Sequence, residues 1–158
     1  MNGFFTEELI RSLGSSCRFS FASESSRKLV VSIVEEKNDP IGYRYDRELS
    51  GALKKSLLPT EGRQKLRLQI SLCEKGVREA FFGPFEITED IDFDFVEEDS
   101  LGDLSFVDGA GTRKSVLAFS LGQLESINAA QEAAKRVLYR KAARRIIEIL
   151  DAKYPITP

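Results

Sequence analysis

The densest group of ionisable side chains is the run from Glu86 to Asp103, which holds nine carboxylates and no Lys or Arg. Spaced carboxylates can hold Ca²⁺ through oxygen ligands or supply an acid–base pair. The spacing matches no calcium-loop motif, and the alternation places Asp90, Asp92 and Asp94 on one face of a strand. We therefore expect a solvated strand face that discourages edge pairing. A cation site and a docking surface are the alternatives.

The opposite charge collects near the C-terminus, where the segment from Ser126 to Lys153 carries seven cations and three acids. Arg136, Arg140 and Arg144 follow one another at a spacing of four, so a helix would align them on one face. An ordinary solvated helix face is the simpler interpretation. The functional alternative is a basic stripe for phosphate or acidic lipid head groups.

Catalytic motifs find no support in the sequence. There is no His, which removes the commonest general base and metal ligand. Gly109-Ala110-Gly111 lacks the following Lys of a phosphate-binding loop. Cys17 and Cys73 are too few for a zinc cluster, and we expect buried free thiols, with a single disulfide as the alternative. We predict no metal, no cofactor and no enzymatic activity; an enzyme that uses the carboxylates is the remaining alternative.

Length and composition indicate an ordinary globular protein. At 158 residues, with 42% apolar and 30% charged residues, the chain is expected to form one domain, spanning 1–158. The net charge of −2 gives no general attraction to nucleic acid or to an anionic membrane. No stretch approaches the roughly 20 apolar residues of a membrane-spanning helix.

Two helices and about four strands are expected to position these groups. Thr6 to Leu13 has helical spacing, with Thr6 as cap and Gly14 as stop. The predicted strands are a short one in CRFSFAS (17–23), a β-branched one at 29–34, an alternating one at 66–72, and an alternating one within 77–99. Pro84 must lie at a strand entry, an edge or a bulge. Ser100 to Thr112 reads as a loop.

The C-terminal helix, from Asn128 to about Lys153, is the clearest element. It carries an apolar stripe at a spacing of four, which Val137 and Ile149 widen: Ala134, Leu138, Ala142, Ile146 and Leu150. Two amphipathic helices over one face of a mostly antiparallel sheet make an α+β fold, a two-layer sandwich.

Aromatic and cationic residues crowd the stretch IGYRYDR, Ile41 to Arg47, and the same connection ends in LLPTEGR. The preceding strand is expected to bend at Asn38-Asp39-Pro40 and to continue as an extended arm. A hairpin needs only a few connecting residues, whereas more than twenty lie between the predicted strands. Since no catalytic partner exists for this segment, we interpret it as a contact surface.

In running order, these segments resemble the lipopolysaccharide-assembly lipoprotein family LptE. The segments that carry the resemblance are LVVSIVEEKNDPIGYRYDRE, LLPTEGRQKLRLQISL, GPFEITEDIDFDF and FSLGQLESINAAQEAAKRVLYRKAARRIIEIL. It extends from about Phe5 to Asp151 and follows the order of elements, not one short signature.

The resemblance implies a non-catalytic lipoprotein on the periplasmic face of the outer membrane. Such a protein plugs an LptD-type β-barrel and contacts lipopolysaccharide. Family members carry a lipidated Cys directly after a signal peptide. No such Cys stands at the start of this sequence, so we expect the signal peptide and the anchor to lie outside it; Cys17 does not take that role.

The resemblance also implies which residues contact lipopolysaccharide or the barrel. Arg44 and Arg47 are the first candidates, and Tyr43 and Tyr45 would stack on sugar rings or line the barrel wall. The further candidates on the following strand are Arg63, Lys65 and Arg67. One departure is the wholly acidic strand EITEDIDFDF, which would instead meet basic groups inside the barrel. The alternative class is an unrelated periplasmic adaptor or small-ligand-binding α+β domain.

Overall fold

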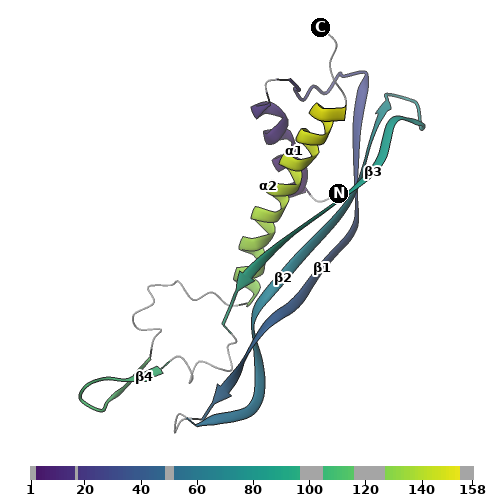
Figure 1. Ribbon diagram of the computed structural model, residues 1–158. Helices are drawn as coiled ribbons and strands as arrows, with labels where there is room; N and C mark the ends of the chain where they lie inside the picture. Colours follow the sequence, from purple (N-terminus) through teal and green to yellow (C-terminus); the bar gives the residue numbers. More distant parts are fainter. Residues whose placement is uncertain (1–2, 17, 49–51, 97–104, 116–126, 154–158) are drawn as a thin grey trace. The chain divides into compact units, whose positions relative to one another are not determined.

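The computed structural model describes residues 3–16, 18–48, 52–96, 105–115 and 127–153. Its elements are, in chain order, α1 (Gly3–Ser15), β1 (Arg27–Arg47), β2 (Leu53–Glu74), β3 (Ala80–Asp94), β4 (Ser105–Val107), β5 (Arg113–Ser115) and α2 (Ile127–Lys153) (Figure 1). The first three strands form an antiparallel sheet in the order β1-β2-β3, and β4 pairs separately with β5. The predicted α+β class is thereby confirmed, with three strands in the sheet instead of four.

The chain divides into two compact units that share the long strands. The first comprises Met1–Lys37, Lys65–Ile91 and Lys135–Pro158, and the second comprises Asn38–Gln64 and Asp92–Ala134.

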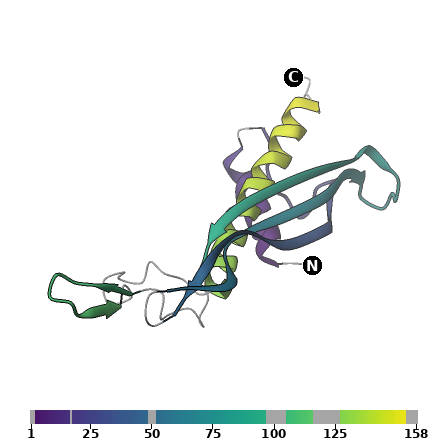
Figure 2. The same ribbon diagram turned by 60° about the horizontal axis from the view of Figure 1, so that its bottom comes forward.

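The hydrophobic core of the first unit lies between the sheet and the two helices. Strand β2 contributes Leu66, Leu68 and Ile70, all with no exposed surface, as the clean alternation predicts. Phe5 and Leu9 of α1 pack into the same cluster. Both views show the helices beside one face of the sheet (Figures 1 and 2).

Helix α2 buries a wider face than its sequence indicates. All five predicted stripe residues are buried, but Val137, predicted to widen the stripe, is 48% exposed. The stripe widens on the other side, through Tyr139, Ala143 and Ile147. The reason is that α1 packs there as well: the rings of Phe5 and Tyr139 meet edge to face with centroids 5.2 Å apart. Helix α2 is therefore covered by both the sheet and a second helix.

The predicted strand at 17–23 is wrong for the residues that are described, because 18–26 belong to no strand. Phe19 packs against the core whereas Phe21 is 59% exposed, so the alternation of the two rings does not mark a buried face. The Ser16 hydroxyl instead accepts the backbone N–H groups of Arg18 and Phe19, which turns the chain. Helix α1 also continues through Gly14, predicted as its stop, to Ser15.

The acidic strand β3 has the predicted two faces. Asp90, Asp92 and Asp94 are exposed, while Ile87 and Phe95 are buried on the other side. Pro84 lies in β3, an edge strand of the sheet, where its missing N–H breaks no inner ladder. The residues of the acidic run from 97 to 103 lie outside the described part.

Strand β1 runs unbroken from Arg27 to Arg47 and β2 begins at Leu53, so the predicted connection of more than twenty residues is wrong. What read as a charged connection is the far part of a long β-hairpin. The alternation of β1 is interrupted. The odd-numbered residues Leu29 and Val31 pack against the core, but further along it is the even-numbered Glu36 whose carboxylate accepts a hydrogen bond of 3.3 Å from the Tyr139 hydroxyl of α2. A switch from odd to even positions on the same side of a strand is typical of a β-bulge.

Cys73 is a buried free thiol, as expected. Cys17 lies outside the described residues.

Candidate functional site

The hairpin in the second unit combines the end of β1 with the beginning of β2. Its tip is closed by a hydrogen bond of 2.8 Å from the N–H of Glu48 to the carbonyl of Ala52. Further along, Gly42 and Glu61 lie close together, since a Cβ on Gly42 would lie 2.7 Å from the Glu61 Cβ. The two strands are therefore in contact at the tip and again at this point.

The register at the tip decides which side chains share a face. Residues opposed across an antiparallel ladder point to the same side of the sheet. Since Glu48 is paired with Ala52, Arg47 is opposite Leu53 and Tyr45 is opposite Lys55. Alternation adds Tyr43 on β1 and Leu57 on β2. We call these six residues, Tyr43, Tyr45, Arg47, Leu53, Lys55 and Leu57, the hairpin face.

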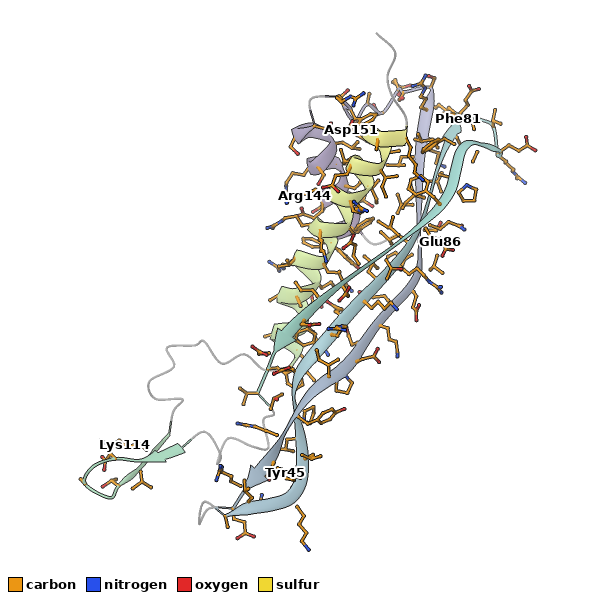
Figure 3. The ribbon with its side chains drawn as sticks, in the orientation of Figure 1. Tyr45, Phe81, Glu86, Lys114, Arg144 and Asp151 are labelled. Carbon is orange, nitrogen blue, oxygen red and sulfur yellow. The ribbon has the colours of Figure 1, made fainter. Side chains whose placement is uncertain are left out.

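The hairpin face exposes its apolar groups to solvent. The exposed fractions are 55% for Tyr43, 54% for Tyr45, 59% for Leu53 and 55% for Leu57. The cations Arg47 and Lys55 are exposed beside them, and Figure 3 labels Tyr45 on the strand. Isolated exposed apolar residues are ordinary, but a continuous group with polar neighbours marks an interaction site.

The opposite face of the hairpin carries an ion pair between its two strands. The Asp46 carboxylate, in a buried residue, lies 2.5 Å from the Lys54 ammonium and also accepts the N–H of Arg47 at 2.8 Å. The hydrogen bond from Lys54 holds the pKa of Asp46 below its ordinary value, and the backbone N–H of Arg47 adds to this effect. Arg44, which is half-buried, alternates onto this side with Asp46. The predicted cluster is therefore divided: Arg44 does not share a face with Tyr43, Tyr45 and Arg47.

Arg63, also in the second unit, is engaged within the sheet. Its guanidinium donates two hydrogen bonds to the Asp92 carboxylate, from Nε at 2.6 Å and from Nη2 at 2.8 Å. This two-pronged contact lowers the pKa of Asp92 below its ordinary value. The pair neutralises part of the acidic strand, so Arg63 and Asp92 act as a cross-strand clamp.

Lys65 and Arg67 belong to the first unit and face the solvent side of β2. Arg67 lies 3.5 Å from the Glu35 carboxylate on β1, and Lys65 is exposed. Of the seven predicted contact residues, the structure thus groups Tyr43, Tyr45 and Arg47, turns Arg44 to the other side, and ties Arg63 and Arg67 to carboxylates.

Sequence reasoning missed Leu53, Lys55 and Leu57. The signal was present in LKKSLL, where apolar residues recur in the segment taken for a connection. This signal is ambiguous, because Leu53 and Leu57 are four positions apart, a spacing that places two residues on the same side of a helix and of a strand alike.

The alternative sites inferred from charge are not assembled in the described part of the chain. No three His, Cys, Asp or Glu side chains gather there as a metal site would require. On α2, Arg140 lies 3.9 Å from Glu8, and Arg136 lies 5.8 Å from the centre of the Phe4 ring. Figure 3 labels Arg144 on the same helix. Two of the three stripe cations thus have contacts on α1.

None of the described helices contains an apolar stretch of the length that a membrane span requires. In comparisons with known proteins, neither a family model nor a curated protein matches the chain.

Proposed function

We propose that this chain is a non-catalytic binding and assembly protein of lipopolysaccharide transport, similar to the LptE family. In this proposal the hairpin face docks on the wall of an LptD-type outer-membrane barrel. The protein would work on the periplasmic side of that membrane, held there by a lipid anchor. The exposed hairpin face is the observation that carries the proposal.

The composition of the hairpin face supports a protein partner. Tyr and Arg are enriched where binding energy concentrates in interfaces, because Tyr brings a large rigid surface at a low entropic cost and Arg brings several hydrogen-bond donors. Tyr43, Tyr45 and Arg47 supply these groups, and each Tyr is more than half exposed. A two-stranded hairpin is itself only marginally stable in water. Docking would therefore stabilise this hairpin as well as bury its apolar groups.

Lipopolysaccharide contact would use the cations beside the aromatic groups. Arginine suits the phosphate groups of such a ligand because its donors form a planar fork. Arg47 on the hairpin face is the first candidate, and Arg44 would contribute from the opposite side. Arg63 is a weaker candidate, since leaving Asp92 would break two short hydrogen bonds.

Co-purification with the LptD-type barrel of the source organism tests the docking claim. We expect the triple variant Tyr43→Ser, Tyr45→Ser and Leu57→Ser to lose the barrel while its melting temperature stays within a few degrees of the wild type. A matched control is Val77→Ser with Val137→Ser, which removes apolar groups that are 51% and 48% exposed elsewhere. A variant hairpin face that still retains the barrel would refute the docking claim, as would a wild-type chain that never forms the complex.

Lipopolysaccharide binding at low and moderate salt tests the ligand claim separately. Losing a charge-assisted hydrogen bond costs about 1.5–3 kcal/mol, or roughly 10- to 150-fold in affinity. We expect Arg44→Ala with Arg47→Ala to weaken binding by this amount and to flatten its salt dependence. Arg63→Ala is the comparator and should have a smaller effect. Unchanged affinity in the double variant would exclude the hairpin cations as the contact.

A further inference from the structure

The first unit contains an open hollow that the proposed function does not use. It lies between α1, the segment 18–25, the beginning of β1 and the end of β2, with a volume of about 570 Å³. This is within the roughly 300–1,000 Å³ of small-molecule sites. Figure 1 shows α1 and the end of α2 near the beginning of β1.

The interior of the hollow is apolar. Helix α1 contributes side chains from successive turns, the two strands add more, and an aromatic ring comes from the following segment: Leu9, Ile10, Leu13, Phe19, Leu29 and Leu72. Leu13, Phe19, Leu29 and Leu72 pack against the core on one side but stay only partly buried. Their remaining apolar surface faces the hollow, so a matching apolar group would gain about 25 cal/mol per Å² by covering it.

The edge of the hollow is cationic. Arg18, Arg27, Lys28 and Lys75 all line it, and no Asp or Glu is found among its described lining residues. Two of these cations have long contacts with nearby acids: Arg18 lies 3.5 Å from Asp151, and Lys75 lies 3.5 Å from Glu24. Exposed pairs at such distances contribute little, so an incoming anion can recruit Arg18 and Lys75 at a small cost.

We infer that this hollow binds a single-chain anionic amphiphile, with the acyl chain among the leucines and a carboxylate or phosphate head group at the cationic edge. An apolar interior alone would admit any hydrophobic ligand, whatever its charge. The four lining cations select the negative head group, and Ser20 and Ser23 add hydroxyl groups to the lining. The inference does not rest on the proposed function, because it uses no residue of the hairpin face and needs no barrel.

Calorimetric titration of the purified chain below the critical micelle concentration tests the ligand class. The probes are decanoate, dodecanoate, dodecyl phosphate and dodecyltrimethylammonium. Burying each methylene should raise affinity about fourfold, so we expect dodecanoate to bind more than tenfold tighter than decanoate. The cationic probe of the same chain length should bind at least tenfold more weakly. A preference for the phosphate or the carboxylate identifies the head group.

Charge reversal tests the edge of the hollow. We expect Lys28→Glu with Lys75→Glu to weaken dodecanoate binding at least tenfold and to improve binding of the cationic probe. The matched control is Arg78→Glu with Arg145→Glu, two exposed cations that do not line the hollow; it should stay within twofold of the wild type. Ile10→Gln makes the interior polar and should reduce the gain per methylene.

Three results would overturn the inference: equal affinity for the two dodecyl probes of opposite charge, no dependence on chain length, or equal losses in the two charge-reversal variants. Because the wild-type chain carries the ligand series, the inference stays testable even if a variant fails to fold. Loss of barrel binding in the hairpin variants with dodecanoate affinity unchanged would separate the two sites. Weaker dodecanoate binding with barrel binding unchanged in the Lys28 and Lys75 variant would likewise show that the two sites are separate.

Discussion

The core face of β2 and the hairpin face are built from the same strands with the same kind of residues, yet their surroundings differ. Leu66, Leu68 and Ile70 have no exposed surface, whereas Leu53 and Leu57 are more than half exposed. In the first unit two helices cover the strand. Among the described residues of the second unit, nothing covers the hairpin face. An alternating apolar pattern therefore predicts a strand, but it does not tell whether the chain itself supplies the cover.

The solvent side of the sheet and the hairpin face also differ in how their charges are arranged. On the solvent side of the sheet, charges meet in cross-strand pairs such as Arg63 with Asp92 and Arg67 with Glu35. Exposed pairs of this kind contribute at most about 1 kcal/mol. On the hairpin, the pair of Asp46 with Lys54 lies on one side while Arg47 and Lys55 stand beside exposed apolar groups on the other. The charge pairs stabilise the sheet, whereas the cations of the hairpin face lie beside apolar groups that a partner would cover.

The largest predicted difference between the two faces is the loss of stability when a leucine is truncated to alanine. Leu68→Ala should lower the free energy of unfolding by about 2–5 kcal/mol, because it leaves a cavity in a fully buried site. Leu57→Ala should change it by less than about 0.5 kcal/mol. Urea denaturation followed by circular dichroism measures both. Equal losses would mean that the isolated chain already covers the hairpin face.

Replacing a glycine by alanine should change the free energy of unfolding somewhat less than Leu68→Ala does, and in opposite directions at Gly62 and Gly14. A Cβ on Gly62 would lie 2.5 Å from the Phe93 ring, so Gly62→Ala should destabilise by about 1–3 kcal/mol. Gly14 lies within α1 with open space around it, and Gly14→Ala should stabilise by roughly 0.5–1 kcal/mol. Thermal unfolding of the two variants side by side checks the pair. A neutral Gly62→Ala would show that the ring moves aside freely.

Removal of a tyrosine hydroxyl should separate the regions further. Tyr139 is fully buried, and its hydroxyl lies 3.3 Å from the Glu36 carboxylate, which also lies 2.7 Å from the Lys135 ammonium. Burial raises the pKa of Tyr139, so the hydroxyl stays protonated and donates. Tyr139→Phe should cost about 0.5–1.5 kcal/mol, whereas Tyr43→Phe should leave unfolding unchanged. Chemical denaturation resolves this difference, and a costly Tyr43→Phe would contradict the solvent exposure of the hairpin face.

The smallest predicted effect is a shift in titration. Since Arg63 lowers the pKa of Asp92 in the folded state, the pair contributes stability above the ordinary Asp range and loses it as the pH falls through the lowered pKa. In Arg63→Gln, the pKa of Asp92 should rise toward its ordinary value, as followed by NMR of the carboxyl carbons. The pKa of Asp46, which depends on Lys54, should stay low and serves as the internal control. An unmoved Asp92 would show that the clamp does not form in solution.

Much of the fold could be predicted from local periodicity. The stripe from Ala134 to Leu150 and the alternation that begins at Leu66 each depend on one element and its burial. The stripe is confirmed, and the alternation is confirmed from Leu66 to Ile70, after which Leu72 is partly buried and Cys73 is buried. Tyr139 and Ile147 were missed because their burial depends on α1, far away in the sequence. The strand expected around Phe19 failed because turn-forming serine contacts outweighed the alternation of two rings.

The candidate surface was only partly predictable. The sequence shows that Tyr43, Tyr45 and Arg47 alternate, but Leu53 and Leu57 join them only through the register set by the bond between Glu48 and Ala52. Register is a long-range property, because one residue of slippage turns a whole strand over. The separation of Arg44 from its neighbours follows from alternation once the segment is known to be a strand.

The hydrogen bond between Glu48 and Ala52 makes the hairpin face sensitive to changes in gene length. Side chains of a strand alternate with a period of two, so one added or lost residue turns the side chains that follow it to the opposite side. An insertion or deletion of one codon between Ala52 and Leu57 would leave the composition almost unchanged. It would nevertheless turn Leu57 to the opposite side of β2, away from Tyr43 and Tyr45. Such a mutation would act on side-chain direction much as a frameshift acts on codons, and a change of two codons would preserve the alternation.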